Sequence, residues 1–128
     1  MKNAGAWTVV DLFSGAGGMS WGFKARSSFQ VVGAADNEQG KPSSGQNSLQ
    51  CNSTYEENIG ITPSALDLGV ASGDDLKAAM GIDHTDVLIS CAPCTGFSRM
   101  MNRNHSLDDP RNSLVARSSE YVAAFRPK

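Results

Sequence analysis

Two cysteines separated by two residues are the part of this sequence best suited to covalent chemistry. Residues 90–98 read SCAPCTGFS, with Cys91 and Cys94 on either side of an Ala-Pro pair. Such a pair could carry out thiol–disulfide exchange, form half of a zinc site, or supply one nucleophilic thiolate beside an uninvolved neighbour.

The first two of these interpretations fit the surrounding sequence poorly. A structural zinc site needs four ligands, and Cys51, His84 and His105 show no ligand spacing relative to the pair. We therefore predict no metal site. A redox pair of the thioredoxin kind usually follows a Trp and a single βα unit, whereas this pair has no Trp before it and comes after three such units. The sequence thus favours a single nucleophile.

A glycine-rich segment near the N-terminus is a second candidate for ligand binding. Residues 11–18 read DLFSGAGG between an apolar, β-favouring run and a helical pattern. Glycines there permit a tight turn and let a ligand approach the backbone closely. The spacing is neither the G-x-G-x-x-G of dinucleotide folds nor a P-loop. Asp36 ends the next predicted strand, where a carboxylate suits two ribose hydroxyls. The pattern favours a nucleoside-type cofactor, with a purely structural turn as the alternative.

The elements that must position these residues alternate along the chain. We predict strands over residues 6–13, 29–35, 65–68 and 86–90, and helices over residues 19–26, 46–58, 74–80 and 111–125. This alternation predicts a parallel α/β sheet with helices on both faces. In such sheets ligands bind outside the carboxyl ends of the strands. Asp11, Asp36, Asp67 and Ser90 all stand at predicted strand ends, so we expect their neighbourhoods to converge.

The bulk composition describes one globular domain inside a cell. The chain has 128 residues, of which 40% are hydrophobic and 19% charged. No apolar run approaches the roughly 18 residues of a membrane helix, and Asp11 interrupts the short apolar run that a secretory signal would need. Three cysteines leave at least one unpaired, which favours a reducing compartment. We expect a protein of the bacterial cytoplasm, associated with the nucleoid, or of a eukaryotic nucleus, with no membrane partner.

Charge is distributed unevenly along the chain. Residues 1–98 hold five Lys/Arg against ten Asp/Glu, whereas residues 99–128 hold six against three and include five of the six arginines. This end forms either the solvated basic face of a helix or a surface that meets phosphate groups.

Taken together, these motifs resemble the C5-cytosine methyltransferases, which bind S-adenosylmethionine. DLFSGAGGMSWGFKA resembles the first motif of that family, and DVLISCAPCTGFS resembles the fourth, with its Pro-Cys followed by an aromatic residue and Ser. TYEENI resembles a Tyr-x-x-Asn segment on the intervening helix, and DDPRNSLV resembles an Arg-containing stretch that leads into the next helix. The resemblance spans nearly the whole chain.

The resemblance implies a class I S-adenosylmethionine-dependent methyltransferase fold, Rossmann-like and here incomplete, with about four strands and flanking helices. It also assigns a cofactor site and a nucleic-acid contact. The implied cofactor-binding residues are Phe13, Ser14, Gly15, Gly17, Gly18, Asp36, Asn37, Asp67, Leu68, Pro93 and Leu114. The implied DNA-contacting residues are Ser98, Arg99, Arg103 and His105.

Within this family Cys94 is the implied catalytic nucleophile. Its thiolate would add to carbon 6 of a cytosine flipped out of the duplex, so that carbon 5 becomes nucleophilic enough to accept a methyl group. Pro93 would fix the backbone before it. Cys91 would be a bystander, a small buried residue at the strand edge.

The sequence departs from the family pattern at several points. Thr95 replaces the usual Gln, Asn37 replaces an aromatic residue after the ribose-binding acid, and the segment between Asp36 and Tyr55 is longer than usual. The family's Glu-Asn-Val and Gln-x-Arg-x-Arg strands, its target-recognition region and its last helix have no counterpart in these 128 residues. The resemblance therefore predicts the N-terminal part of a catalytic domain.

Several expectations about partners and activity follow from this interpretation. We expect double-stranded DNA as substrate, little methylation by the isolated chain, and either a complementing C-terminal half or self-association through an open sheet edge. Two other functions stay open: a tRNA cytosine-5 methyltransferase of the same family, and a non-catalytic fragment that binds S-adenosylmethionine or a partner chain.

Overall fold

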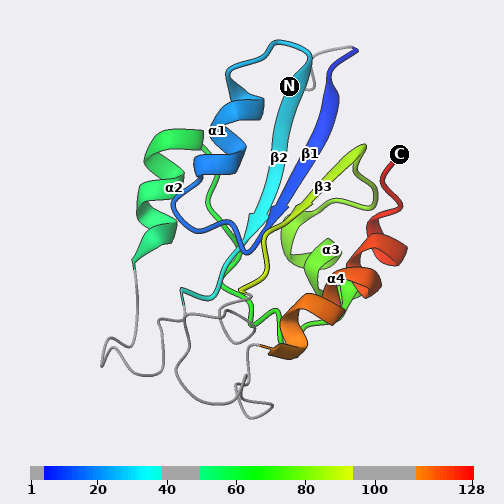
Figure 1. Ribbon diagram of the computed structural model, residues 1–128. Helices are drawn as coiled ribbons and strands as arrows, with labels where there is room; N and C mark the ends of the chain where they lie inside the picture. Colours follow the sequence, from blue (N-terminus) through cyan, green and yellow to red (C-terminus); the bar gives the residue numbers. More distant parts are fainter. Residues whose placement is uncertain (1–4, 39–49, 94–111) are drawn as a thin grey trace, which may run out of the picture.

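A parallel three-stranded sheet lies at the centre of the described chain (Figure 1). The computed structural model describes residues 5–38, 50–93 and 112–128. The strands β1 (Trp7–Leu12), β2 (Phe29–Ala35) and β3 (Val87–Ser90) are ordered β2-β1-β3. Because all three strands run in the same direction, their carboxyl ends lie at the same end of the sheet.

Alternation along β1 divides its side chains between the two faces of the sheet. Val9 packs in one apolar cluster, while Val10 and Leu12 pack in the other, and all three are fully buried. Period-two alternation is what a strand covered on both sides requires. The β-branched and aliphatic residues of β1 therefore serve two hydrophobic cores at once.

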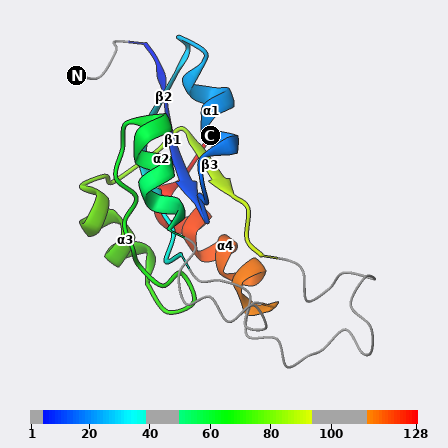
Figure 2. The same ribbon diagram turned by 90° about the vertical axis from the view of Figure 1, so that its left-hand side faces the viewer.

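Helices α1 (Gly18–Lys24) and α2 (Cys51–Ile59) cover one face of the sheet. Figure 2 shows α2 running along the strands on this side. Tyr55 and Ile59 of α2 pack with Val9 and Val31, and Phe23 of α1 joins them from the side. Since Tyr55 is fully buried, α2 contributes its apolar side chains to this core even though the helix as a whole is polar.

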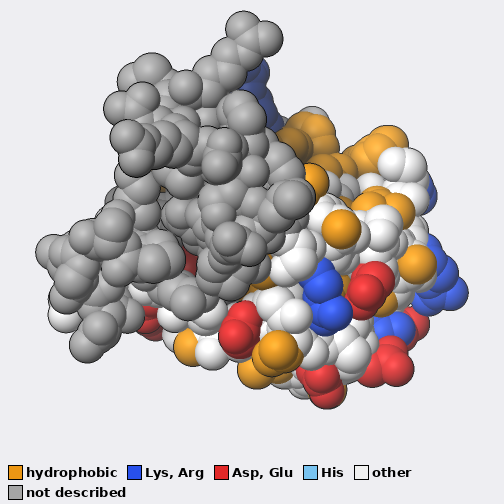
Figure 3. All heavy atoms as spheres, turned by 60° about the horizontal axis from the view of Figure 1, so that its bottom comes forward, with side chains coloured by type: hydrophobic (Ala, Val, Ile, Leu, Met, Phe, Trp, Pro, Cys, Tyr) orange, Lys and Arg blue, Asp and Glu red, His pale blue; other side chains and the backbone are white. Residues whose placement is uncertain are grey.

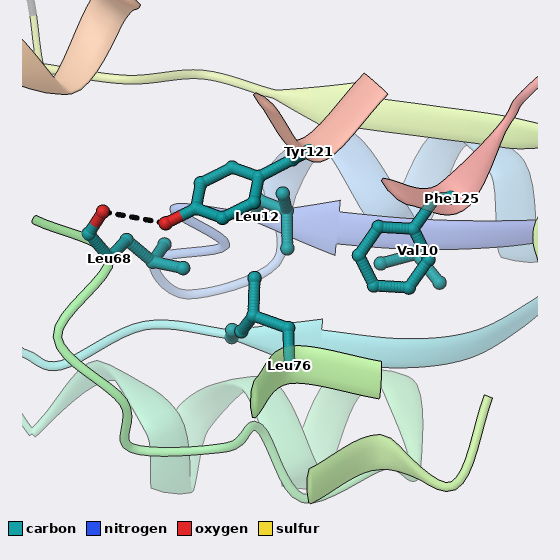
Figure 4. Packing of buried hydrophobic residues seen from close by; sticks show 7 residues of the cluster. Val10, Leu12, Leu68, Leu76, Tyr121 and Phe125 are labelled. Atoms are coloured by element: carbon teal, nitrogen blue, oxygen red, sulfur yellow. Dashed lines mark hydrogen bonds between the residues drawn. The ribbon is translucent and has the colours of Figure 1, made fainter. Parts of the chain in front are cut away.

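Helices α3 (Gly73–Met80) and α4 (Asn112–Phe125) cover the opposite face. Figure 4 shows Tyr121 and Phe125 of α4 lying over β1, with Leu76 of α3 beside them. Helix α3 begins with a capping box, in which the Ser72 hydroxyl accepts from the Asp75 amide at 3.1 Å and the Asp75 carboxylate accepts from the Ser72 amide at 2.8 Å. The result is a three-layer αβα arrangement.

This architecture confirms the predicted Rossmann-like α/β class but corrects the number of strands. Residues 65–68 do not form a strand; a single parallel bridge joins Ser64 to Ala35. Asp67 ends any further pairing because its carbonyl accepts the amides of Val70 and Ala71 and starts a turn. The described sheet therefore has three strands rather than about four, and β3 lies at its edge.

The remaining predicted elements lie close to their expected positions. The helix predicted over residues 46–58 is described over Cys51–Ile59, and residues 46–49 lie outside the described part of the chain. Among the described residues, no helix combines the length and apolar character needed to cross a membrane.

Candidate functional site

A cavity of about 320 Å³ opens at the carboxyl ends of the strands. It takes contributions from the turns after β1 and β2, from the segment before α3, from the segment after β3 and from α4. Eight of the eleven residues implied as cofactor-binding line it: Phe13, Gly15, Asp36, Asn37, Asp67, Leu68, Pro93 and Leu114. Four lining residues were not anticipated for this role: Ala16, Cys51, Gly69 and Cys91.

The glycine turn after β1 is held in an unusual backbone conformation. Phe13, Gly15 and Gly17 all have positive φ, at 57°, 53° and 95°. A Cβ at Gly17 would lie 3.0 Å from the Tyr55 ring, so glycine is required there both for φ and for packing. Phe13 is not a glycine, and its strained φ turns the chain out of the sheet just where the cavity begins.

The other three predicted turn residues lie beside the cavity rather than in its wall. Gly17 and Gly18 line a separate surface pocket with Trp21. Ser14 is buried, and its hydroxyl has no hydrogen-bond partner among the described residues. The Ser14 amide donates to the Ala35 carbonyl at 3.2 Å, so this residue ties the turn to the end of β2.

Asp36 fixes the geometry of this turn with both carboxylate oxygens. Its Oδ2 accepts the Gly15 amide at 2.9 Å and its Oδ1 accepts the Glu38 amide at 2.7 Å. A carboxylate has about four acceptor positions, so Asp36 can accept hydrogen bonds from a ligand in addition to these two. A vicinal diol such as a ribose presents two hydroxyl donors that match this pair of acceptors.

A second carboxylate, Asp11, is buried beneath the turn. The Ser20 hydroxyl donates to Asp11 Oδ2 at 2.6 Å, and the hydroxyls of Ser20 and Tyr55 lie 2.7 Å apart. Burial raises the pKa of Asp11 to about 6, partly opposed by the Ser20 hydrogen bond and reinforced by the charge of Asp36. Burial also raises the pKa of Tyr55 to about 12. This network joins β1, α1 and α2 behind the cavity.

The opposite wall of the cavity is formed by the segment after the Ser64 bridge. Asp67 Oδ1 accepts the Gly69 amide at 2.8 Å, which makes a tight turn. A Cβ on Gly69 would lie 3.0 Å from Asp67 Oδ1 and 3.4 Å from a methyl group of Leu114. Leu68 and Leu114 supply an apolar surface beside this carboxylate, an arrangement suited to a flat ring with a polar edge.

The cysteine segment reaches the same cavity, but differently from our expectation. Cys91 is exposed and borders the cavity, so the prediction of a buried strand-edge residue was wrong. Strand β3 ends at Ser90, and the Cys91 amide still donates to the Leu12 carbonyl at 3.4 Å. Pro93 lines the cavity. Cys94, Ser98, Arg99, Arg103 and His105 lie outside the described residues.

Cys51 is the second described cysteine of the cavity wall, and its chemistry is unsuited to nucleophilic attack. Burial and the negative charges of Asp36 and Glu38 raise the pKa of Cys51 to about 11. It therefore stays a neutral thiol near pH 7. Within the described ranges, no group of three or more potential metal ligands is brought together.

The described atoms that can be seen from this end of the molecule have mixed character. Figure 3 brings the carboxyl ends of the strands toward the viewer and shows acidic, basic and hydrophobic side chains interspersed on the described atoms. Three of the arginines in the basic end of the sequence, Arg99, Arg103 and Arg111, lie outside the described residues.

Comparisons with known proteins connect this arrangement with one family. The chain is 34% identical over 124 residues to the type II methyltransferase M.XorII of Xanthomonas oryzae pv. oryzae, covering 93% of this chain and 26% of that protein. It is 31% identical over 121 residues to the type II methyltransferase M.DdeI of Desulfomicrobium norvegicum, covering 94% of this chain and 26% of that protein. The chain thus spans about a quarter of the length of these curated relatives.

A solved structure shares both the fold and part of the sequence. An E. coli protein encoded within a prophage, described as a candidate DNA modification methyltransferase, superposes with a TM-score of 0.66 at 28% identity. The match covers 95% of this chain and 30% of that one. The family model for C-5 cytosine-specific DNA methylases matches residues 7–128, nearly the whole sequence. The chain therefore belongs to the C-5 cytosine-specific DNA methylase family.

Proposed function

We propose that this chain is the N-terminal part of an enzyme that transfers a methyl group from S-adenosylmethionine to carbon 5 of cytosine in DNA. The observation that carries the proposal is the convergence of Asp36, Asp67 and Pro93 on one cavity in a chain of this family. These residues follow three different elements, so their meeting is a property of the fold rather than of any one motif.

The cavity walls match the parts of S-adenosylmethionine. The carboxylate oxygens of Asp36 suit the ribose hydroxyls, and the carboxylate of Asp67 suits an exocyclic amino group on a purine. Phe13, Leu68 and Leu114 offer apolar surface to the ring. When bound, the cofactor supplies an electrophilic methyl group on a sulfonium.

The proposed chemistry at the target base belongs to Cys94. Its thiolate adds to carbon 6 of cytosine, and electron density moves to carbon 5, which becomes the nucleophile. Loss of the carbon 5 proton after methylation allows the thiolate to leave carbon 6, which restores both the aromatic ring and the free cysteine. Pro93, the residue bonded to Cys94, lines the cavity, which supports this assignment.

DNA is the substrate that we propose. The family model and the type II methyltransferases among the relatives support DNA over RNA. Ser98, Arg99, Arg103 and His105 are the proposed contacts to the DNA around the flipped base. Since M.XorII and M.DdeI are about four times longer, we also propose that the 128 residues alone transfer little methyl group and need a complementing half.

Covalent trapping tests the proposed nucleophile. The chain would be coexpressed with the part of M.XorII beyond its matched region and incubated with S-adenosylmethionine and duplex DNA that contains 5-fluorocytosine. Because fluorine at carbon 5 cannot leave as a proton does, the thiolate should remain attached to carbon 6. We expect an adduct at Cys94, identified by peptide mass spectrometry, and none in Cys94→Ser.

A matched cysteine variant completes this test. Cys91→Ser removes the other thiol of the pair and should leave the adduct in place. An adduct that persists in Cys94→Ser would contradict the assignment. A complex that binds the cofactor but gives no adduct would favour a non-catalytic binding fragment. An adduct formed with a 5-fluorocytosine tRNA but not with DNA would favour the RNA methyltransferase instead.

A further inference from the structure

We propose that Arg117 and Tyr121 of α4 are positioning residues that make the cofactor site selective for adenine. This inference rests on the proposed cofactor site. Neither residue lines the cavity. Both act on the turn Asp67–Ala71, which carries the carboxylate proposed to meet the adenine amino group.

The two side chains bind the same pair of backbone carbonyls. The Tyr121 hydroxyl lies 2.7 Å from the Leu68 carbonyl oxygen and 2.9 Å from that of Ala71. Arg117 donates from Nε to the Leu68 oxygen at 3.3 Å and from a terminal nitrogen to the Ala71 oxygen at 2.6 Å. Figure 4 shows the Tyr121 ring reaching from α4 toward Leu68. We call these four contacts the α4 clamp.

The α4 clamp involves buried groups rather than side chains on the surface. Tyr121 is fully buried and Leu68 is 3% exposed. The Tyr121 hydroxyl has one hydrogen, which cannot make a full hydrogen bond to both carbonyls at once. Arg117 supplies a second donor to each of these two carbonyl oxygens. The Arg117 guanidinium also lies 5.8 Å from the Tyr121 ring and pairs with Glu120 at 3.5 Å, which restricts its rotamer.

The clamped turn sets the position of the Asp67 carboxylate. Within the turn, Asp67 Oδ1 accepts the Gly69 amide, and the Asp67 carbonyl accepts the amides of Val70 and Ala71. All of these groups belong to residues 67–71, the segment that contains the two clamped carbonyls of Leu68 and Ala71. One turn before Arg117 on the same helix, Leu114 lies against Gly69 and lines the cavity. Helix α4 therefore fixes both the polar and the apolar part of this wall.

Selectivity for adenine follows from a fixed carboxylate. Adenine presents an amino donor to Asp67, whereas hypoxanthine presents a carbonyl oxygen that the carboxylate would repel. A turn that can shift would let the carboxylate move away from that oxygen, and hypoxanthine would be tolerated better. Loss of the clamp should thus reduce the ratio between the affinities for the adenine and the hypoxanthine ligand.

The test compares the dissociation constants of S-adenosylhomocysteine and S-inosylhomocysteine by calorimetry on the 128-residue chain. We expect the wild type to prefer the adenine ligand, and we expect Arg117→Met and Tyr121→Phe each to reduce this preference about tenfold. Arg117→Lys should keep more of the preference than Arg117→Met, because a single ammonium group can replace only part of the two-nitrogen contact of the guanidinium. Arg126→Met is the matched control, since Arg126 pairs with Asp83 away from the turn.

Two results would overturn the inference while leaving the proposed cofactor site intact. One is a wild type that binds both ligands equally, and the other is a set of clamp variants that weaken both ligands by the same factor. Failure of the wild type to bind either ligand would instead remove the proposed function, and the inference with it.

A ligand-free measurement covers variants that fold poorly. In Arg117→Lys, the mildest variant, amide hydrogen exchange at Gly69, Val70 and Ala71 should accelerate while exchange in β1 stays unchanged. Unchanged exchange at these three amides would overturn the clamp as a positioning device.

Discussion

At the scale of single residues, the cavity end of the sheet holds two carboxylates in very different surroundings. Asp36 has two backbone amide donors and faces the cavity, whereas Asp11 is 1% exposed and has the Ser20 hydroxyl on one oxygen. Burial raises the pKa of Asp11 to about 6 from an unfolded value near 3.8. The charged form of Asp11 is therefore a cost to the folded state at neutral pH.

This cost gives a pH dependence with a definite sign. Because the pKa of Asp11 is raised on folding, its contribution favours the folded state below about pH 4 and is lost as pH rises through about 6. Asp11→Asn cannot ionise. We expect its free energy of unfolding, relative to wild type, to rise between pH 4 and pH 6.5 by at most about 3 kcal/mol. Urea unfolding at several pH values measures this difference.

The comparison with Asp11→Asn removes other titrations from the result. Hydrogen bonds and cations lower the pKa values of Asp75, Asp83 and Asp86, so these groups titrate below this window and in the opposite sense. They are common to both proteins and cancel in the difference. If the free energies of unfolding of wild type and Asp11→Asn changed in parallel between pH 4 and pH 6.5, the raised pKa of the buried Asp11 carboxylate would be contradicted.

The residue-level part of the site was predictable only where a strand pattern pointed to it. Asp36 and Asp67 stand where apolar runs stop, and Pro93 follows the apolar run of residues 86–90, so their convergence could be expected from the parallel topology. Arg117 and Tyr121 gave no such signal. Their partners lie 46 to 53 residues away in sequence, and contacts at that separation are set by how α4 packs.

At the scale of elements, close packing of α3 against α4 holds one side of the cavity in place. A Cβ added to Gly73 would lie 2.3 Å from the Cβ of Ala124, far inside van der Waals contact. Because a Cβ is fixed by the backbone, neither atom can move unless a helix shifts. Gly73 is thus a packing glycine, and its φ is not in the left-handed region.

Two identical substitutions should therefore have opposite effects. Gly73→Ala should lower the free energy of unfolding by about 1–3 kcal/mol, because overpacking outweighs the gain in helix propensity. Gly22→Ala in α1, where a Cβ meets nothing within 4 Å, should raise it by about 0.5–1 kcal/mol. Chemical denaturation of the two variants checks both signs. A stabilising Gly73→Ala would show that α3 and α4 do not pack as described.

The accuracy of the predicted helix and strand boundaries differs from one element to the next. Strands β1 and β2 and helices α3 and α4 were predicted nearly to the residue because long runs or caps mark them. The short run at 65–68 was also predicted as a strand, yet the only pairing described there is the bridge from Ser64 to Ala35. The outcome depends on hydrogen bonds that Asp67 accepts from the amides that follow it, a local competition that hydrophobic periodicity does not describe.

At the scale of the whole molecule, the described sheet has β3 at one edge. An unpaired edge of a parallel sheet exposes backbone donors and acceptors that another strand can use. We expect the 128-residue chain to associate with itself in a concentration-dependent way, measured by sedimentation velocity. Addition of the complementing half should reduce this association. A chain that stays monomeric at all concentrations and is unaffected by that half would contradict the proposed open edge.

The whole account depends on S-adenosylmethionine binding in the cavity at the carboxyl ends of the strands. The most direct test is a titration of the isotope-labelled chain with S-adenosylmethionine, followed by backbone amide chemical shifts. We predict the largest shifts at Gly15, Asn37, Gly69 and Leu114, which surround the cavity, and their loss in Asp36→Ala. The absence of any shift would contradict the account. So would shifts confined to Gly81, Asp83 and Asp86, which line a separate pocket at the opposite end of the strands.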